Sequence, residues 1–250
     1  MVGLMARGMI RLYLDQPLGP GQSVALDEAQ AHYLFAVMRE GVGTAVLLFN
    51  GRDGEWLARV ESAGKRAGVL RCDSQTRVQG AAPDLWLLFA PVKKARTDFI
   101  VEKAVELGVA HLVPVQTDFT NADRIRQDKA EAHVREAAEQ CEATWLPTVA
   151  PLTSFERLLA GWDPSRRILW ADEGVAREMA DMPLSARLAG LPRGPWAVLV
   201  GPEGGFSDAE RARLGALPFV VPVTLGPRIL RAETAALALL TLWQAQLGDW

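Results

Sequence analysis

The sequence predicts an α/β protein with a β-rich N-terminal region and a C-terminal region built around a mostly parallel sheet. Over residues 10–78, short runs of β-forming residues are separated by turn residues. From residue 84 onward, buried strand-like runs alternate with helical stretches, which is typical of strand–helix–strand units. Residues 75–83, between the two regions, are polar and small, so we expect a linker there.

In the N-terminal region we expect four strands, over residues 10–14, 45–49, 56–60 and 69–72. The run Asn50-Gly51-Arg52-Asp53-Gly54 is a strong turn signal between the second and third of them. One helix is expected at about residues 27–38, with Asp27 as its N-cap.

The C-terminal region begins with a predicted strand at residues 85–90, followed by a basic loop at residues 93–96. We expect Thr97 or Asp98 to cap a helix that ends at Gly108, because glycine favours the left-handed conformation that follows many helices. Further predicted elements are a strand at 109–115, a helix at about 128–143 and a short strand at 168–170. Residues 176–195 are irregular and proline-rich, and no element is predicted there.

Two consecutive strand–turn–helix units form the most informative part of the chain. In the first, the strand 196–200 leads into Gly201-Pro202-Glu203-Gly204-Gly205. Ser207 and Glu210 then match a capping box that opens a helix.

The second unit has a strand at 219–224, a turn at 225–228 and a long apolar helix from about 229 to 246. Ligands of open α/β sheets bind at the carboxyl ends of the strands, so two glycine-bearing loops side by side indicate a small-molecule pocket. Neither a dinucleotide fingerprint nor a P-loop is present, and on spacing alone two ordinary turns explain the pattern equally well.

Composition limits the class of protein. A net charge of −3 gives no overall attraction to RNA, so any RNA binding must depend on local basic patches. The two cysteines, Cys72 and Cys141, have no metal-like spacing. We find no secretory signal in residues 1–11 and no apolar run long enough to span a membrane, and we expect a cytoplasmic protein.

The motifs GPEGGFSDAE (201–210) and LGPRILRAETAALALL (225–240) resemble those of SPOUT-class methyltransferases that modify N3 of uridine in 16S ribosomal RNA. Weaker matches extend the resemblance over nearly the whole chain. It implies a PUA-like β-barrel domain over residues 1–78 and a SPOUT α/β domain with a trefoil knot over residues 84–250. It also implies S-adenosyl-L-methionine as methyl donor without a metal, a homodimer, and 16S ribosomal RNA or the small ribosomal subunit as partner.

By this resemblance, three loops bind the methyl donor. The expected donor-binding residues are Trp170, Ala171, Val200, Gly201, Gly204, Gly205, Leu225, Gly226, Ile229 and Leu230. Glycines suit this role because they allow backbone to approach a ligand closely.

Three residues are candidates for the chemistry. Arg231 offers planar donors to a uracil carbonyl or a phosphate. Glu233 is a candidate to orient Arg231 or to accept the N3 proton, although a carboxylate near a helix N-terminus is equally well explained by capping. Glu203 is a candidate for bracing the loop or for proton transfer, and the general base is not identified.

For RNA binding, the candidates are Arg39, Lys93, Lys94, Arg96, Arg124 and Arg126, with Lys129 beside the last two. A solvated basic face explains any single one of these cations as well. One departure from the family is Ala143, which stands where an arginine is usual after the Glu-Gln-Cys run. His32, His111 and His133 have no spacing that points to catalysis.

Three other functions remain open at this stage. The same chemistry on another RNA position is compatible with all the motifs. A ribosome-assembly factor that has kept the fold without catalysis is suggested by Ala143 alone. A nucleotide-binding metabolic enzyme would fit the α/β pattern without the resemblance.

Overall fold

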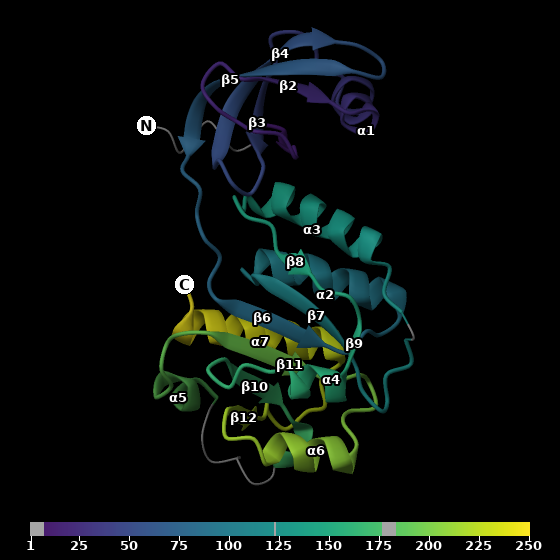
Figure 1. The fold of residues 1–250 in the computed structure, drawn as a ribbon, viewed down its shortest axis with the longest axis vertical. Coiled ribbons are helices and arrows are strands. Elements are labelled where there is room, and N and C mark those ends of the chain that lie inside the picture. The colour runs from purple at the N-terminus through teal and green to yellow at the C-terminus, as the bar shows by residue number, and fades with distance from the viewer. Residues whose placement is uncertain (1–7, 123, 177–183) are drawn as a thin grey trace. The chain divides into compact units, whose positions relative to one another are not determined.

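The computed structural model describes residues 8–122, 124–176 and 184–250 (Figure 1). The chain divides into two compact units. The first comprises Met1–Ala81 with Ala138–Leu146, and the second comprises Ala82–Ala137 with Pro147–Trp250. Residues 1–7, which belong to the segment inspected for a secretory signal, lie outside the described part. Within that part, no helix is both long and apolar enough to cross a membrane.

The first unit contains a five-stranded sheet in the order β1-β3-β4-β5-β2. The strands are β1 (Arg11–Tyr13), β2 (Ser23–Leu26), β3 (Ala45–Phe49), β4 (Glu55–Ala63) and β5 (Gly68–Arg77). The pair β1–β3 is parallel, and the other pairs are antiparallel. All four predicted strands are present. The prediction missed β2, because only two residues of this short edge strand, Val24 and Leu26, face the core.

The predicted N-cap and turn of this unit are confirmed. Asp27 caps α1 (Glu28–Ala31) in a reciprocal capping box with Gln30. The predicted helix then continues as a π-helix, His32–Val37, before Arg39 adopts a left-handed conformation with φ of 61°. In the predicted turn, the Asn50 side chain accepts hydrogen bonds from the backbone N–H groups of residues 52 and 53.

A buried arginine holds residues 138–146 in the first unit. Arg11 is 7% exposed; it donates to Glu55 Oε2 at 2.7 Å and to the carbonyls of Ala138 and Ala143 at 2.5 and 2.6 Å. Ala143 itself is buried. The position at which the family usually has an arginine is therefore part of the packed interior in this chain.

The second unit is built on a seven-stranded sheet in the order β12-β10-β11-β6-β7-β8, with β9 also pairing β7. All of its pairings are parallel. The strands are β6 (Leu85–Phe89), β7 (His111–Gln116), β8 (Thr148–Val149), β9 (Thr153–Ser154), β10 (Arg167–Ala171), β11 (Trp196–Val200) and β12 (Val220–Val223). The mostly parallel sheet predicted from the sequence is confirmed, whereas the trefoil knot stays a prediction.

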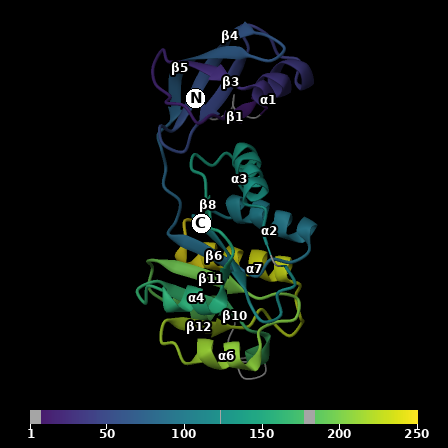
Figure 2. The same ribbon diagram turned by 45° about the vertical axis from the view of Figure 1, so that its right-hand side comes forward.

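Helices cover both faces of this sheet, as its continuously apolar strands require. On one face, Phe155 of α4 (Phe155–Ala160) and Leu214 of α6 (Asp208–Gly215) pack on alternate strand residues such as Leu88 and Leu199. On the other, α7 (Ala232–Leu247) packs against β11 and contacts α2 (Lys94–Glu106) and α5 (Leu184–Ala189). Figure 1 and Figure 2 show α7 lying along the sheet.

Several helix boundaries differ from the predictions. The helix α2 begins at Lys94, not at Thr97 or Asp98, because the Thr97 hydroxyl bonds instead to the backbone of Val92. Lys94 and Arg96 therefore lie on a helix and not in a loop. The helix α7 begins at Ala232, three residues after the predicted start. Strand β5 extends to Arg77, so the first residues of the predicted linker belong to a strand.

Other helices were predicted correctly from the sequence or were missed. The helix α3 (Gln127–Cys141) was predicted within two residues, and the capping box of Ser207 and Glu210 is confirmed at the start of α6. Gly108 ends α2 as predicted, with φ of 74°. The prediction missed the short helices α4 and α5. Residues 177–183 of the unassigned stretch lie outside the described residues.

Candidate functional site

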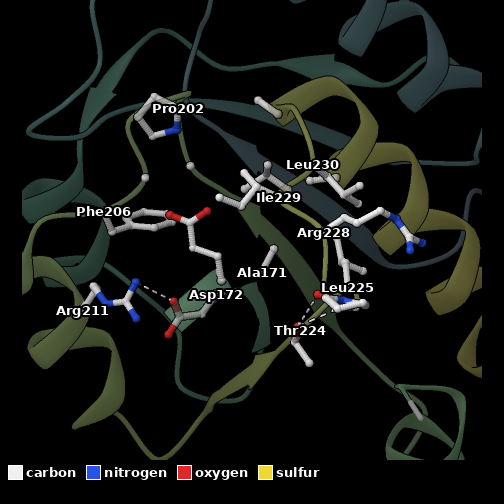
Figure 3. Close-up of a pocket in the computed structure, with 18 residues that line it drawn as sticks. Ala171, Asp172, Pro202, Phe206, Arg211, Thr224, Leu225, Arg228, Ile229 and Leu230 are labelled. Carbon is white, nitrogen blue, oxygen red and sulfur yellow. Dashed lines mark hydrogen bonds and ion pairs between the residues drawn. The ribbon is translucent and has the colours of Figure 1, made fainter. Parts of the chain in front are cut away.

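A pocket of about 130 Å³ opens at the carboxyl ends of β10, β11 and β12 in the second unit (Figure 3). Three loops and the start of α7 form its walls. These residues line it: Ala171, Asp172, Glu173, Val200, Gly201, Pro202, Gly205, Phe206, Arg211, Thr224, Leu225, Gly226, Pro227, Arg228, Ile229, Leu230, Ala232 and Ala235. We call it the donor pocket.

Eight of the ten expected donor-binding residues line this pocket, and Trp170 and Gly204 do not. Trp170 is 3% exposed, and its ring meets that of Phe206 edge-on with centroids 5.7 Å apart. Gly204 faces away, since a Cβ there would lie 3.1 Å from the Cβ of Phe119. Trp170 thus supports the pocket from the core, and the backbone at Gly204 packs on the loop after β7.

Two glycines of the pocket are required by its geometry. A Cβ on Gly201 would lie 2.7 Å from Cε2 of Phe206, which is closer than real Cβ atoms approach their neighbours. Gly226 has φ of 102°, a conformation that residues with side chains rarely adopt. Both loops therefore present backbone, not side chains, at these points.

An ion pair stiffens one wall of the pocket. Arg211 of α6 places Nη1 2.7 Å from Oδ1 of Asp172, a carboxylate that is almost completely buried. Asp172 Oδ1 also accepts a hydrogen bond from the backbone N–H of Gly174 at 2.9 Å. A side chain at Gly174 would collide with the Arg211 guanidinium. Figure 3 shows Arg211 reaching Asp172 on the opposite side of the view from Arg228. Neither member of this pair was among the candidates from the sequence, although Asp172 lies two residues after the predicted strand at 168–170.

Two arginines and two glutamates form a cluster at the starts of α2 and α7 and the loop after β11. Arg96 pairs with Glu203, and its Nε lies 3.4 Å from Oε1 of Glu233. Arg231 Nη1 lies 3.6 Å from the same Oε1 of Glu203. The cluster brings together all three candidates for the chemistry and one residue that the sequence analysis had grouped with the RNA-binding cations.

The oxygens of Glu233 differ in their surroundings. The side chain is 16% exposed, and Oε1 faces Arg96. The other oxygen, Oε2, is buried and has no hydrogen-bond partner among the described residues. A buried acceptor without a partner is costly, so the ion pair with Arg96 does not by itself account for this carboxylate.

The remaining basic candidates lie in different places. Lys93 lines a hollow together with Glu203, and Lys94, Arg124 and Arg126 line another. Arg39 is exposed and belongs to the first unit.

None of the three histidines lines the donor pocket. His111 lies at the amino end of β7, opposite the carboxyl edge, and burial lowers its pKa with a smaller contribution from Arg166. Among the described residues, no group of three or more histidine, cysteine or acidic side chains is arranged to hold a metal ion.

Comparison with known proteins identifies the family. Residues 80–244 match the family model of the RNA methyltransferase domain, and residues 26–71 match that of the RNA methyltransferase PUA domain. The chain belongs to the RNA methyltransferase family. It combines a PUA domain with a SPOUT-type α/β methyltransferase domain.

Individual relatives within this RNA methyltransferase family cover most of the chain. The ribosomal RNA small subunit methyltransferase E of Synechocystis sp. is 33% identical over 85% of this chain and 70% of its own length. The enzyme of that name from Neisseria gonorrhoeae, solved bound to S-adenosyl methionine, is 27% identical, with a TM-score of 0.85 over 97% of this chain and 99% of its own. A Legionella pneumophila methyltransferase in complex with the bound cofactor SAM is 28% identical, with a TM-score of 0.84 over the same shares.

Proposed function

We propose that this protein transfers a methyl group from S-adenosyl-L-methionine to N3 of a uridine in 16S ribosomal RNA. The observation that carries the proposal is the backbone-lined pocket at three strand ends, together with the nearby cluster of Arg96, Glu203, Arg231 and Glu233. Relatives named ribosomal RNA small subunit methyltransferase E support the substrate class, and two similar structures hold the donor.

The donor pocket has the groups that S-adenosylmethionine needs. Leu225, Ile229 and Leu230 offer an apolar surface to the adenine ring, and backbone at Gly201 and Gly226 can approach the ligand closely. Glu173 and Arg228 offer opposite charges for the ammonium and carboxylate of the methionyl part. When bound, S-adenosylmethionine supplies an electrophilic methyl group on a sulfonium centre.

The acceptor must lose its N3 proton while negative charge spreads onto the flanking carbonyl oxygens. Arg231 serves the second need, because its guanidinium is 64% exposed and offers planar N–H donors to a uracil oxygen or a phosphate. Glu203, at 3.6 Å, limits the directions in which this arginine can point. Preorganised donors of this kind are a large source of rate enhancement in enzymes.

Glu233 is our candidate for the proton acceptor. Its Oε2 has no partner among the described residues, and its Oε1 is held by Arg96. Glu203 is the second candidate, although its contacts with two arginines favour a bracing role. The acceptor base has to be unpaired or flipped before its N3 edge can reach either carboxylate.

The proposal includes a homodimer that acts in the cytoplasm on 16S ribosomal RNA or on the assembled small subunit. The alternatives are a methyltransferase for another RNA position and an assembly factor without catalysis. Ala143, the feature that suggested the assembly factor, is buried, so it marks no altered surface for RNA.

The first experiment uses S-adenosylmethionine labelled in its methyl group and small ribosomal subunits from a strain that lacks this modification. We expect label on one uridine, carried on N3. Subunits that are already modified serve as the matched control and should take up none. Label on another nucleotide would identify a different RNA position, and donor binding without any label would favour the assembly factor.

A further inference from the structure

Two further hollows continue the donor pocket along the carboxyl edge of the sheet. The middle hollow is lined by Pro91, Val92, Lys93, Asn121, Ala122, Pro202 and Glu203. The basic hollow, of about 230 Å³, is lined by Pro91, Val92, Lys94, Thr97, Asp98, Val101, Ala122, Arg124, Ile125, Arg126, Lys129 and Ala130. Pro202 belongs to both the donor pocket and the middle hollow, while Pro91, Val92 and Ala122 are shared by the two hollows.

The order of the strands explains why these three spaces form a row. The sheet runs β12-β10-β11-β6-β7, and all of these strands are parallel, so the loops at their carboxyl ends lie side by side. The donor pocket uses the loops after the first three strands. The hollows use the loops after β11, β6 and β7 and the starts of α2 and α3.

Side-chain contacts fix the loops around the hollows. The Thr97 hydroxyl bonds to both N and O of Val92 at 3.0 Å, which ties the loop after β6 to α2. The buried Glu210 accepts a hydrogen bond from the backbone N–H of Asp118 at 3.0 Å, which ties the loop after β7 to α6. These contacts hold Val92 and Asp118, one residue of each loop, against the neighbouring helices.

The charges of the basic hollow are unequal. Among the described residues, four cations line it, Lys94, Arg124, Arg126 and Lys129, together with one carboxylate, Asp98. Arg126 pairs with Asp128 at 2.6 Å on the surface, and Asp98 lies 3.7 Å from His133. Within the described part of the chain, Lys94, Arg124 and Lys129 form no ion pair. Three cations that make no ion pair there, beside a single carboxylate among the described lining residues, favour an anionic ligand.

We propose that the basic hollow binds a backbone phosphate of the RNA strand, close to the acceptor uridine. This inference rests on the proposed function and adds a specific contact to it. A strand anchored here passes over the middle hollow to reach Glu203 and the donor pocket, because these spaces share their walls. Lysine and arginine at the rim neutralise a phosphodiester without reading sequence, so this contact positions the strand.

The three cations of the basic group at residues 93–96 have three different surroundings. Lys94 faces the basic hollow, Lys93 faces the middle hollow, and Arg96 is engaged with Glu203 and Glu233. Lys129, which the sequence placed in one basic group with Arg124 and Arg126, also lines the basic hollow. Removing Lys94, Arg124 and Lys129 together should therefore weaken RNA binding and leave donor binding intact.

The test measures binding of an unmodified 16S ribosomal RNA transcript as a function of salt, for the full-length protein and its K94A/R124A/K129A variant. Each phosphate that is no longer neutralised lowers the slope of log Kd against log salt by about 0.7, so loss of this one phosphate contact should lower the slope by about 0.7 and weaken binding several-fold. The control variant R213A removes an exposed cation of α6 outside the row and should bind like the unaltered protein. Affinity for S-adenosylmethionine, measured on all three proteins, reports on folding.

A second arm replaces the phosphates next to the acceptor uridine by neutral methylphosphonates. The unaltered protein should bind this RNA more weakly than the RNA with its natural phosphates. The triple variant should bind both RNAs almost equally, because it lacks the side chains that contact the phosphate. An unchanged salt slope with normal donor binding would overturn the phosphate site and leave the methyltransferase proposal standing. Loss of binding to assembled subunits alone, with transcript binding unchanged, would overturn it in favour of a ribosomal protein contact. Absence of methyl transfer by the unaltered protein would instead count against the proposed function.

Discussion

Arg96 Nε lies 3.4 Å from Oε1 of Glu233, so an ion pair joins the first turn of α2 to the first turn of α7. The same guanidinium pairs with Glu203 in the loop after β11. One arginine thus holds two carboxylates that come from distant parts of the sequence. Arg96 lies where we propose that the loops of the donor pocket meet the RNA strand that carries the acceptor uridine.

Substitution of Arg96 should affect the chemical step more than RNA binding. In R96A the two carboxylates lose their common partner, and small displacements of catalytic groups are costly, so we expect kcat to fall by roughly tenfold to a hundredfold. R96K keeps the charge and loses the planar fork, and should recover only part of the rate. Steady-state kinetics with varied RNA measure the effect. A rise in KM with unchanged kcat would make Arg96 an RNA contact, as the sequence first indicated.

Glu233 can be tested as a proton acceptor by the variant E233Q. The amide has nearly the same shape but accepts no proton, so we expect the single-turnover rate to fall by about 10² to 10⁴. If the carboxylate only stabilises the N-terminus of α7 through the helix dipole, E233Q should lower the free energy of unfolding by about 0.3–1 kcal/mol and change the rate little. Thermal unfolding and single-turnover kinetics on the same samples separate the two roles. Donor affinity serves as the control, since Glu233 does not line the donor pocket.

The sequence predicted the loops of the donor pocket well, because glycines and prolines at strand ends leave a local signal. Gly201 and Gly226 were identified in this way, and both have backbone geometry that a side chain would disturb. Asp172 and Arg211 were missed, since their pairing joins β10 to α6 and no local pattern records it. The ion pair of Arg96 with Glu233 is a tertiary contact of the same kind.

Local sequence patterns also gave the wrong first residue for α2 and α7. Thr97 is a good N-cap residue by type, yet its hydroxyl bonds to Val92 and lies inside α2. The apolar run from Ile229 continues the pattern of α7, but residues 225–231 form a pocket loop and Ile229 is 84% exposed. Thr97 favours an N-cap by residue type but makes a tertiary contact, and Ile229 fits the helical pattern but belongs to a binding surface.

Gly201 offers a test of the pocket with a matched glycine elsewhere in the chain. In G201A the new methyl group meets the Phe206 ring at 2.7 Å, so the ring or the loop must shift. We expect affinity for S-adenosylmethionine to fall by tenfold or more. At Gly215, the last residue of α6, a methyl group would meet no atom within 4 Å beyond its own helix, so G215A should bind the donor normally. Calorimetric titration of both variants decides whether close packing at Gly201 shapes the pocket.

The buried pair of Arg11 and Glu55 predicts how stability depends on pH. Burial raises the pKa of Glu55, but hydrogen bonds from Arg77, Arg11 and Thr76 outweigh it and hold the pKa below its usual value of 4.5. The stability that this carboxylate contributes is therefore fully present above about pH 4.5 and is lost as the pH falls through its lower folded-state value. In E55Q that acid-dependent loss should disappear.

Urea unfolding at several values of pH between neutral and acidic conditions tests this prediction. E55Q should be less stable than the unaltered protein near pH 7, because Arg11 remains buried without its counter-charge. The difference should narrow steadily as the solution is acidified below pH 4.5. As a control, E61Q alters a more exposed glutamate in β4 whose nearest ion-pair distance is 3.6 Å, and it should change stability little at any pH. A gap between E55Q and the unaltered protein that stays constant down to strongly acidic pH would show that Glu55 acts through packing and not through its charge.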